Sequence, residues 1–189
     1  HAGYVFFAVL PGGKGALSDF SASAVIFYLA AYALTNVGAW AVVMAVEKGE
    51  GMGSEISDYA GLARTRPGLA MAMALFMLSL TGLPPTIGFV AKFYVFRAAL
   101  TAGYTWLVLV GVVTVLISAY YYLRVIVFMW MRAGAGLAVT PRPLNFTVAL
   151  TAVATLTFGL LPGPLMALVE NSVCCLFRLP VSPVDVLKI

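Results

Sequence analysis

The chain has 189 residues, of which 62% are hydrophobic and only 10% are charged, and its mean hydropathy is +1.02. Soluble domains carry about 25% charged residues, because polar side chains must cover the surface that faces water. The composition therefore excludes an ordinary soluble enzyme and indicates an integral membrane protein. The net charge of +4 comes from basic residues scattered near helix ends, without the basic stripe typical of nucleic-acid-binding proteins.

Apolar stretches divide the chain, and none alternates with the two-residue period of a membrane β-strand. A helix that spans a bilayer needs about 20 residues, so the first stretch is only part of a spanning helix. The sequence predicts an all-α polytopic transmembrane helix bundle in which one helix is discontinuous. The predicted helices cover residues 1–10 in part, 21–46, 67–100 with a break at 82–85, 104–131 and 144–169.

The distribution of basic residues predicts an orientation. If each long segment crosses once, the loops at 47–66 and 132–143 share one side of the membrane. The positive-inside rule places these two loops in the cytoplasm and the C-terminus outside. The basic residues behind this prediction are Lys48, Arg64, Arg66, Arg132 and Arg142, against Lys14, Arg178 and Lys188 on the other side.

The first residue is His1 rather than methionine, and "HAGYVFFAVLPGG" has the character of a helix that is already under way. It lacks the basic region and cleavage site of a signal peptide. We therefore expect the chain to be the C-terminal piece of a longer protein. His1 is the only histidine of the sequence and can titrate near neutral pH, so it is a candidate functional residue.

The motif "GLPP" interrupts the longest apolar segment. Pro84 and Pro85 lack N–H groups, so the carbonyls of Leu80 and Thr81 lose their helical donors. Gly82 adopts backbone conformations that other residues resist. These features predict a helix break, and such breaks persist at membrane depth only where protein or water satisfies the freed backbone groups.

Lys92 lies about two turns into the second half of this broken helix, among apolar residues. Burying an ammonium at the bilayer centre costs at least about 2.5–3.5 kcal/mol. Such a lysine either finds a carboxylate or water, or loses its proton, and a lysine balanced between these forms can load and release a proton. Broken helices also mark the ion sites of transporters. The alternatives are that Lys92 snorkels to the membrane surface or only secures the break.

Polar residues in the second predicted helix recur on one face. Tyr28, Tyr32 and Asn36 follow the four-residue spacing of a helix, and Thr35 lies beside them. A polar stripe in lipid turns toward other helices or toward water. The stripe is a candidate proton path, and hydrogen bonding between helices without transport is the alternative.

The fourth predicted helix contributes two further candidates. Tyr122 shares a face with Ser118, and Arg124 either lines a polar path or snorkels to the surface. No aspartate or glutamate lies deep in a predicted helix. We therefore expect an acidic partner of Lys92 to come from outside this sequence.

Motifs for other chemistry are missing from the sequence. "PGGKG" and "GEGMG" match neither the P-loop nor the dinucleotide-binding fingerprint. The adjacent Cys174 and Cys175 lack the spacing of a metal or iron–sulfur site. We expect no metal site, no bound cofactor and no nucleic-acid partner for this chain.

Three stretches resemble a known family: "MLSLTGLPPTIGFVAKFYVF", "AYYYLRVIVFMW" and the opening "HAGY". They are similar to the antiporter-like membrane subunits of proton-translocating NADH–quinone oxidoreductase (respiratory complex I), which are related to subunits of multisubunit sodium/proton antiporters. The lysine in its context, with "YYYLRV", is most similar to the subunit N branch. The resemblance extends from His1 to about the fifth predicted helix.

The resemblance implies a C-terminal part of a proton-translocating domain, in a bacterial plasma membrane and coupled to NADH oxidation and quinone reduction. In this family a broken helix carries a lysine of the central hydrophilic axis, which matches Lys92. The histidine of the "HAGY" stretch lies near that axis, which matches His1. NADH, FMN, iron–sulfur clusters and quinone would be bound by partner subunits. The implied partners are other membrane subunits of complex I, the lipid bilayer, protons and water.

Further key residues of the family would precede His1, so we do not expect this piece to pump by itself. Two other functions stay open. The first is a subunit of a sodium/proton antiporter, or a membrane subunit of a proton-pumping hydrogenase, with the same role for Lys92. The second is a structural membrane subunit without a proton path.

Overall fold

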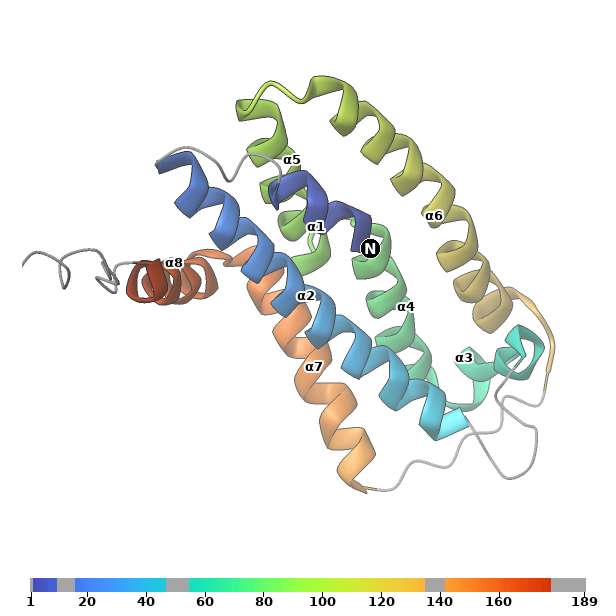
Figure 1. Cartoon of the computed structure of the whole chain (residues 1–189). Coiled ribbons are helices and arrows are strands. Elements are labelled where there is room, and N and C mark those ends of the chain that lie inside the picture. The colour runs from blue at the N-terminus through green and yellow to red at the C-terminus, as the bar shows by residue number, and fades with distance from the viewer. Residues whose placement is uncertain (1, 10–15, 47–54, 135–141, 178–189) are drawn as a thin grey trace, which may run out of the picture.

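The computed structural model describes residues 2–9, 16–46, 55–134 and 142–177, and these residues form a helical bundle without a strand (Figure 1). This confirms the predicted all-α class. The elements in chain order are α1 (Ala2–Val9), α2 (Ala16–Val46), the short 3₁₀ helix η1 (Ile56–Tyr59), α3 (Leu62–Thr65), α4 (Pro67–Thr81), α5 (Ile87–Thr101), α6 (Thr105–Met131), α7 (Arg142–Leu160) and α8 (Gly163–Phe177).

Three described helices are long and apolar enough to cross a membrane by themselves: Phe20–Val46, Thr105–Met131 and Arg142–Leu160. By contrast, α4 and α5 have 15 residues each and are about 22 Å long. This is less than the roughly 30 Å of a bilayer core. They follow one another along the bundle (Figure 1) and together make one discontinuous crossing, as the sequence predicts.

Helix α2 crosses the bundle diagonally (Figure 1) and packs against both halves of the broken helix. Its second half shares a core cluster with α4 that includes Val42 and Phe76. Its first half shares another cluster with α5 that includes Phe27 and Val95. A Cβ atom at Gly38 would lie 2.3 Å from the ring of Phe76, so glycine lets α2 approach α4 closely. The break is therefore held between two packed cores.

The connections at one end of the bundle confirm part of the predicted topology. A Cβ atom at Gly61 would lie 2.3 Å from the carbonyl oxygen of Gly134, so the loop before α3 touches the chain after α6. The described parts of the two predicted loops, residues 55–66 and 132–134, therefore share a side. Gly61 has a φ of +76°, which favours glycine at this contact.

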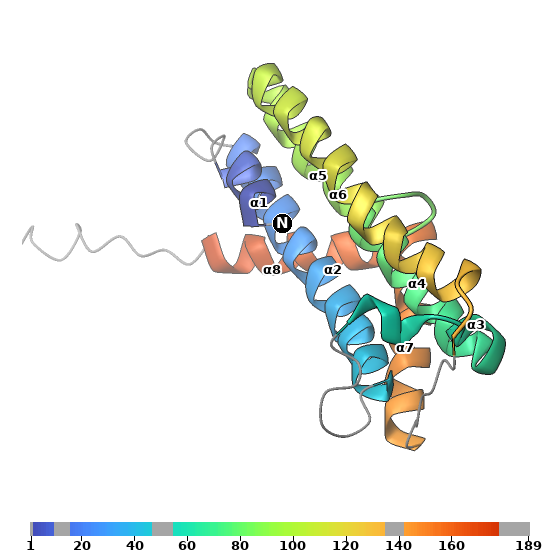
Figure 2. The same cartoon turned by 90° about the vertical axis from the view of Figure 1, so that its right-hand side faces the viewer.

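One predicted helix is wrong in its extent. The sequence indicated a single crossing over 144–169, whereas α7 ends at Leu160 and α8 begins at Gly163. Pro162 and Pro164 both lack the N–H groups that a continuous helix would need. After this interruption α8 runs across the bundle instead of extending α7 (Figure 2).

Candidate functional site at the broken helix

Gly82 ends α4 in a left-handed conformation, with φ +91°. Its N–H donates to the carbonyl oxygens of Leu78 and Ser79, at 2.9 and 3.0 Å, and the N–H of Leu83 donates to Leu78 at 3.0 Å. This is the pattern in which a glycine after the helix closes its last turn. It satisfies the carbonyls of Leu78 and Ser79 and leaves the last two carbonyls of α4 to find other donors.

Lys92 supplies those donors. Its Nζ atom lies 2.8 Å from the carbonyl oxygen of Leu80 and 2.6 Å from that of Thr81, and its side chain is only 5% exposed. These are the two carbonyls that Pro84 and Pro85 were predicted to free. The alternative in which Lys92 snorkels to the membrane surface is therefore wrong, because the ammonium is bound inside the break.

A close contact between the two half-helices allows Lys92 to reach back. A Cβ atom at Gly88, in the first turn of α5, would lie 1.9 Å from the carbonyl oxygen of Ser79. The N–H of Gly88 donates to the Ser79 hydroxyl at 3.2 Å, which satisfies one of the orphan donors at the start of α5. A Cβ atom at Gly82 would lie 2.8 Å from Cδ of Lys92. Two glycines thus make room for the lysine.

Tyr4 of α1 covers the ammonium from another side. Nζ of Lys92 lies 5.5 Å from the centre of the Tyr4 ring, within the range of a cation–π interaction. The Tyr4 hydroxyl lies 2.8 Å from Oγ1 of Thr114 on α6. Sequence reasoning missed Tyr4 and Ser79, because only the packing of α1 and α4 brings them to the lysine. It also missed Thr114, which contacts Tyr4 from α6.

The lysine forms one wall of a small cavity, here called the Lys92 cavity, between α2 and the break. Within it the hydroxyls of Thr35 and Ser79 lie 3.2 Å apart, which links the polar stripe of α2 to the end of α4. The lining residues are Tyr28, Ala31, Tyr32, Thr35, Ser79, Leu80, Gly88, Ala91 and Lys92. The predicted stripe therefore does face the lysine at three of its four positions.

The structure does not bring every predicted residue to this cavity. The side-chain amide of Asn36 donates to the carbonyl of Tyr32 at 2.8 Å, within α2, and does not line the cavity. Tyr122 is half-buried against the core that joins α2 and α4. Arg124 is exposed, and its guanidinium lies 5.7 Å from the ring centre of Phe128. These three residues are not among those that line the Lys92 cavity, and His1 lies outside the described residues.

The charge of the site is uncompensated by acidic side chains in the described part of the chain. There, the hydrogen bonds of the Lys92 ammonium go to two backbone carbonyls, and no carboxylate pairs with it. The described residues also contain no group of three histidine, cysteine, aspartate or glutamate side chains that could hold a metal ion.

The fold and the site define a class: a polytopic α-helical membrane protein with a cationic side chain buried at a discontinuous helix. A family model described as the transmembrane domain of NADH:quinone oxidoreductase and Mrp antiporter proteins matches residues 1–118. The chain belongs to this family. The match confirms the family resemblance of the "GLPP" and "HAGY" stretches.

Curated relatives point in the same direction. The chain is 46% identical over 179 residues to NADH-quinone oxidoreductase subunit N of Chloroflexus aggregans, and 41% identical over 175 residues to that of Bdellovibrio bacteriovorus. These alignments cover 93% and 91% of the chain and 36% of each relative. The chain therefore spans about a third of the length of the curated relatives it matches.

A solved structure has the same arrangement of helices. A chain of respiratory complex I from Thermus thermophilus, with bound aureothin, matches with a TM-score of 0.70 and 27% sequence identity. The match covers 88% of this chain and 43% of the Thermus chain. The similarity thus includes most of the bundle described above.

Proposed function

We propose that the chain is part of a membrane subunit, of the subunit N type, in a proton-translocating NADH–quinone oxidoreductase. Family membership and relatives named subunit N support the assignment to this complex. The observation that carries the proton role is the burial of Lys92 at the break, where it is bound to the carbonyls of Leu80 and Thr81. A cation buried at this depth of a membrane costs free energy, and for that reason ionisable residues in membrane helices are rare and are by default candidates for binding or transport.

The geometry suggests how one proton moves. A lysine ammonium has three N–H groups, and in Lys92 two of them are held by the carbonyls of α4. The third can pass its proton to water or a hydroxyl in the Lys92 cavity that passes its own proton onward in the same step, which leaves a neutral amine and a neutral acceptor. The amine keeps two N–H groups for the carbonyls, but these bonds are weaker because charge-assisted bonds are roughly twice as strong. Proton release would thereby loosen the joint between α4 and α5.

The cavity would connect this lysine to the rest of the path. Tyr28, Tyr32 and Thr35 line it from α2, and the hydroxyl of Ser79 extends it toward the break. We propose that water and these hydroxyls carry protons to and from Lys92. Tyr4 would hold the cation in position through its ring.

The redox chemistry would take place elsewhere. NADH, FMN, iron–sulfur clusters and quinone would be bound by partner subunits in a bacterial plasma membrane, and this chain would contribute the membrane part. The family description also includes Mrp antiporters, so an antiporter subunit is a second candidate. Co-purification with a quinone-reducing peripheral arm separates the two candidates.

A structural role for Lys92 is the strongest competing explanation, because its two hydrogen bonds also close the end of α4. The substitution Lys92→Arg distinguishes the two roles. Arginine keeps donors and charge, but it does not release a proton at physiological pH. A structural cap tolerates arginine, whereas a proton carrier does not.

The experiment uses the complete complex, reconstituted in vesicles, with NADH oxidation and proton uptake recorded together. For Lys92→Arg we expect a clear loss of protons moved per electron while the complex stays assembled. Arg97→Lys is the matched control, because Arg97 is exposed on the same helix. An unchanged ratio in an assembled Lys92→Arg complex would overturn the proton role and leave the cap.

A further inference from the structure

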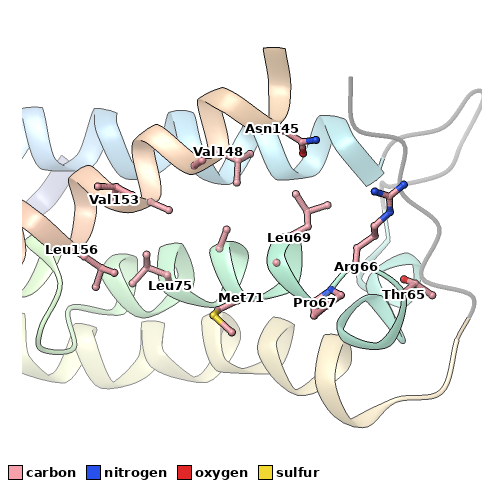
Figure 3. Close-up of a pocket in the computed structure, with 14 residues that line it drawn as sticks. Thr65, Arg66, Pro67, Leu69, Met71, Leu75, Asn145, Val148, Val153 and Leu156 are labelled. Atoms are coloured by element: carbon pink, nitrogen blue, oxygen red, sulfur yellow. The ribbon is translucent and has the colours of Figure 1, made fainter. Parts of the chain in front are cut away.

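A second space in the molecule lies away from the Lys92 cavity, between α4 and α7. This α4–α7 groove has a volume of about 640 Å³. Figure 3 shows side chains that line it from α4 and α7. Arg66 and Asn145 lie at one end, and most of the length is apolar. The full lining is Thr65, Arg66, Pro67, Gly68, Leu69, Met71, Ala72, Leu75, Asn145, Val148, Ala149, Ala152, Val153 and Leu156.

We propose that the α4–α7 groove binds an acyl chain of an anionic phospholipid, with the phosphate of its headgroup at Arg66. The depth of the groove fits one leaflet. Its α4 wall, 67–75, is about 12 Å long and its α7 wall, 145–156, about 16 Å, at 1.5 Å per residue. Half of a bilayer core is about 15 Å thick, which matches the length of the groove. A protein helix that spans the membrane would instead need the full core thickness of about 30 Å.

The walls and floor of the groove suit a flexible hydrocarbon chain. Met71 and Val153 are 62% and 63% exposed, and Leu156 is 37% exposed. Between such side chains, Ala72 and Ala149 are too small to fill the space. A single acyl chain can adapt to the uneven shape of these apolar surfaces.

The charge at the end of the groove favours an anion. Arg66 is exposed, stands directly before α4, and forms no ion pair within the part of the chain that the structure describes. Helices α4 and α7 both begin at this end, so their N-terminal partial positive charges add to that of the arginine (Figure 3). Arginine binds phosphate oxygens through paired N–H groups. A headgroup phosphate therefore complements this end, and the apolar remainder takes the chain below it.

The test measures lipid that stays bound to the complete complex. The complex is purified, washed with detergent after addition of phosphatidylglycerol, and its retained lipid is quantified by mass spectrometry. Ala149→Trp fills the groove, and Arg66→Gln removes the charge. The matched controls are Leu116→Trp, at a position 67% exposed on α6, and Arg132→Gln, an arginine outside the groove.

We expect Ala149→Trp and Arg66→Gln to lower retained phosphatidylglycerol several-fold relative to both controls. Photoreactive phosphatidylglycerol should crosslink to peptides of α4 and α7 in the unmodified complex, and less in these two variants. Equal retention in all four variants, without crosslinks in α4 or α7, would overturn the proposal. Failed assembly of Ala149→Trp with full retention in Arg66→Gln would instead assign the groove to a protein segment. None of these outcomes depends on Lys92.

Discussion

Two cationic residues on α5 show what burial does to the same kind of charge. Lys92 is 5% exposed and donates to two backbone carbonyls of the preceding half-helix. Arg97, less than two turns later, is exposed, and its guanidinium lies 5.3 Å from the ring centre of Phe20. Both interrupt an apolar sequence, but only the first replaces missing hydrogen bonds of the backbone. The helix face on which such a charge lies therefore sets its burial and its hydrogen-bond partners.

The largest difference between the two residues should appear in stability when each charged side chain is replaced by methionine. Lys92→Met leaves the carbonyls of Leu80 and Thr81 without this donor, which costs about 1–3 kcal/mol for each buried acceptor. Arg97→Met removes an exposed side chain and should change stability by no more than about 0.5 kcal/mol. The stability of both variants is measured as the fraction of the subunit that stays in the purified complex after graded heating. Equal retention would contradict the role of Lys92 as the donor at the break.

A pair of glycines sharpens the comparison, because it tests the contact that brings Lys92 inside. Gly88→Ala places a Cβ atom 1.9 Å from the backbone oxygen of Ser79, and such overpacking costs typically about 1–3 kcal/mol. Gly68→Ala meets nothing within 4 Å and, in the first turn of α4, should stabilise its helix by at most about 0.5–1 kcal/mol, the gain at the middle of a helix. The same heating assay measures both variants. A stabilised Gly88→Ala complex would show that α4 and α5 need not approach so closely.

The smallest of these effects concerns the aromatic cover of the lysine. Tyr4→Phe keeps the ring over Lys92 but loses the hydrogen bond to Thr114, a loss of about 0.5–1.5 kcal/mol. We expect lower retention on heating but an unchanged number of protons per electron. Thr114→Val removes the same bond from the other side and serves as the control. A drop in proton uptake with Tyr4→Phe alone would place its hydroxyl in the proton path.

Long apolar sequences predict crossings well but say little about their surroundings. The α2 span Phe20–Val46 and the α6 span Thr105–Met131 are both strongly apolar, yet 44% of the first window is buried against 11% of the second. For this reason Tyr28 and Thr35 of the α2 stripe are buried in the interior, whereas Arg124 on α6 is exposed. The two spans have the same length and similar hydropathy, and they differ in how much of their surface neighbouring helices cover.

The amino-acid sequence by itself determined the helical class, the break after Thr81 and the two carbonyls that the break leaves open. These follow from local chemistry, because proline has no N–H group and a long apolar run forms helices in lipid. The end of α7 was equally readable from Pro162 and Pro164, and the prediction overlooked it.

Only the tertiary structure decided which side chain donates hydrogen bonds to the two carbonyls that the break leaves unpaired. That hydrogen bonding depends on the contact of Gly88 with Ser79 and on the space that Gly82 leaves for the Lys92 side chain. It also depends on Tyr4, far from Lys92 in the sequence, whose ring lies over the Lys92 ammonium. Each is a packing relation between separate helices, and helix spacing along the sequence carries no information about it. The physical reason is that proline frees a carbonyl locally, whereas the donor that binds it is selected by distance and burial in three dimensions.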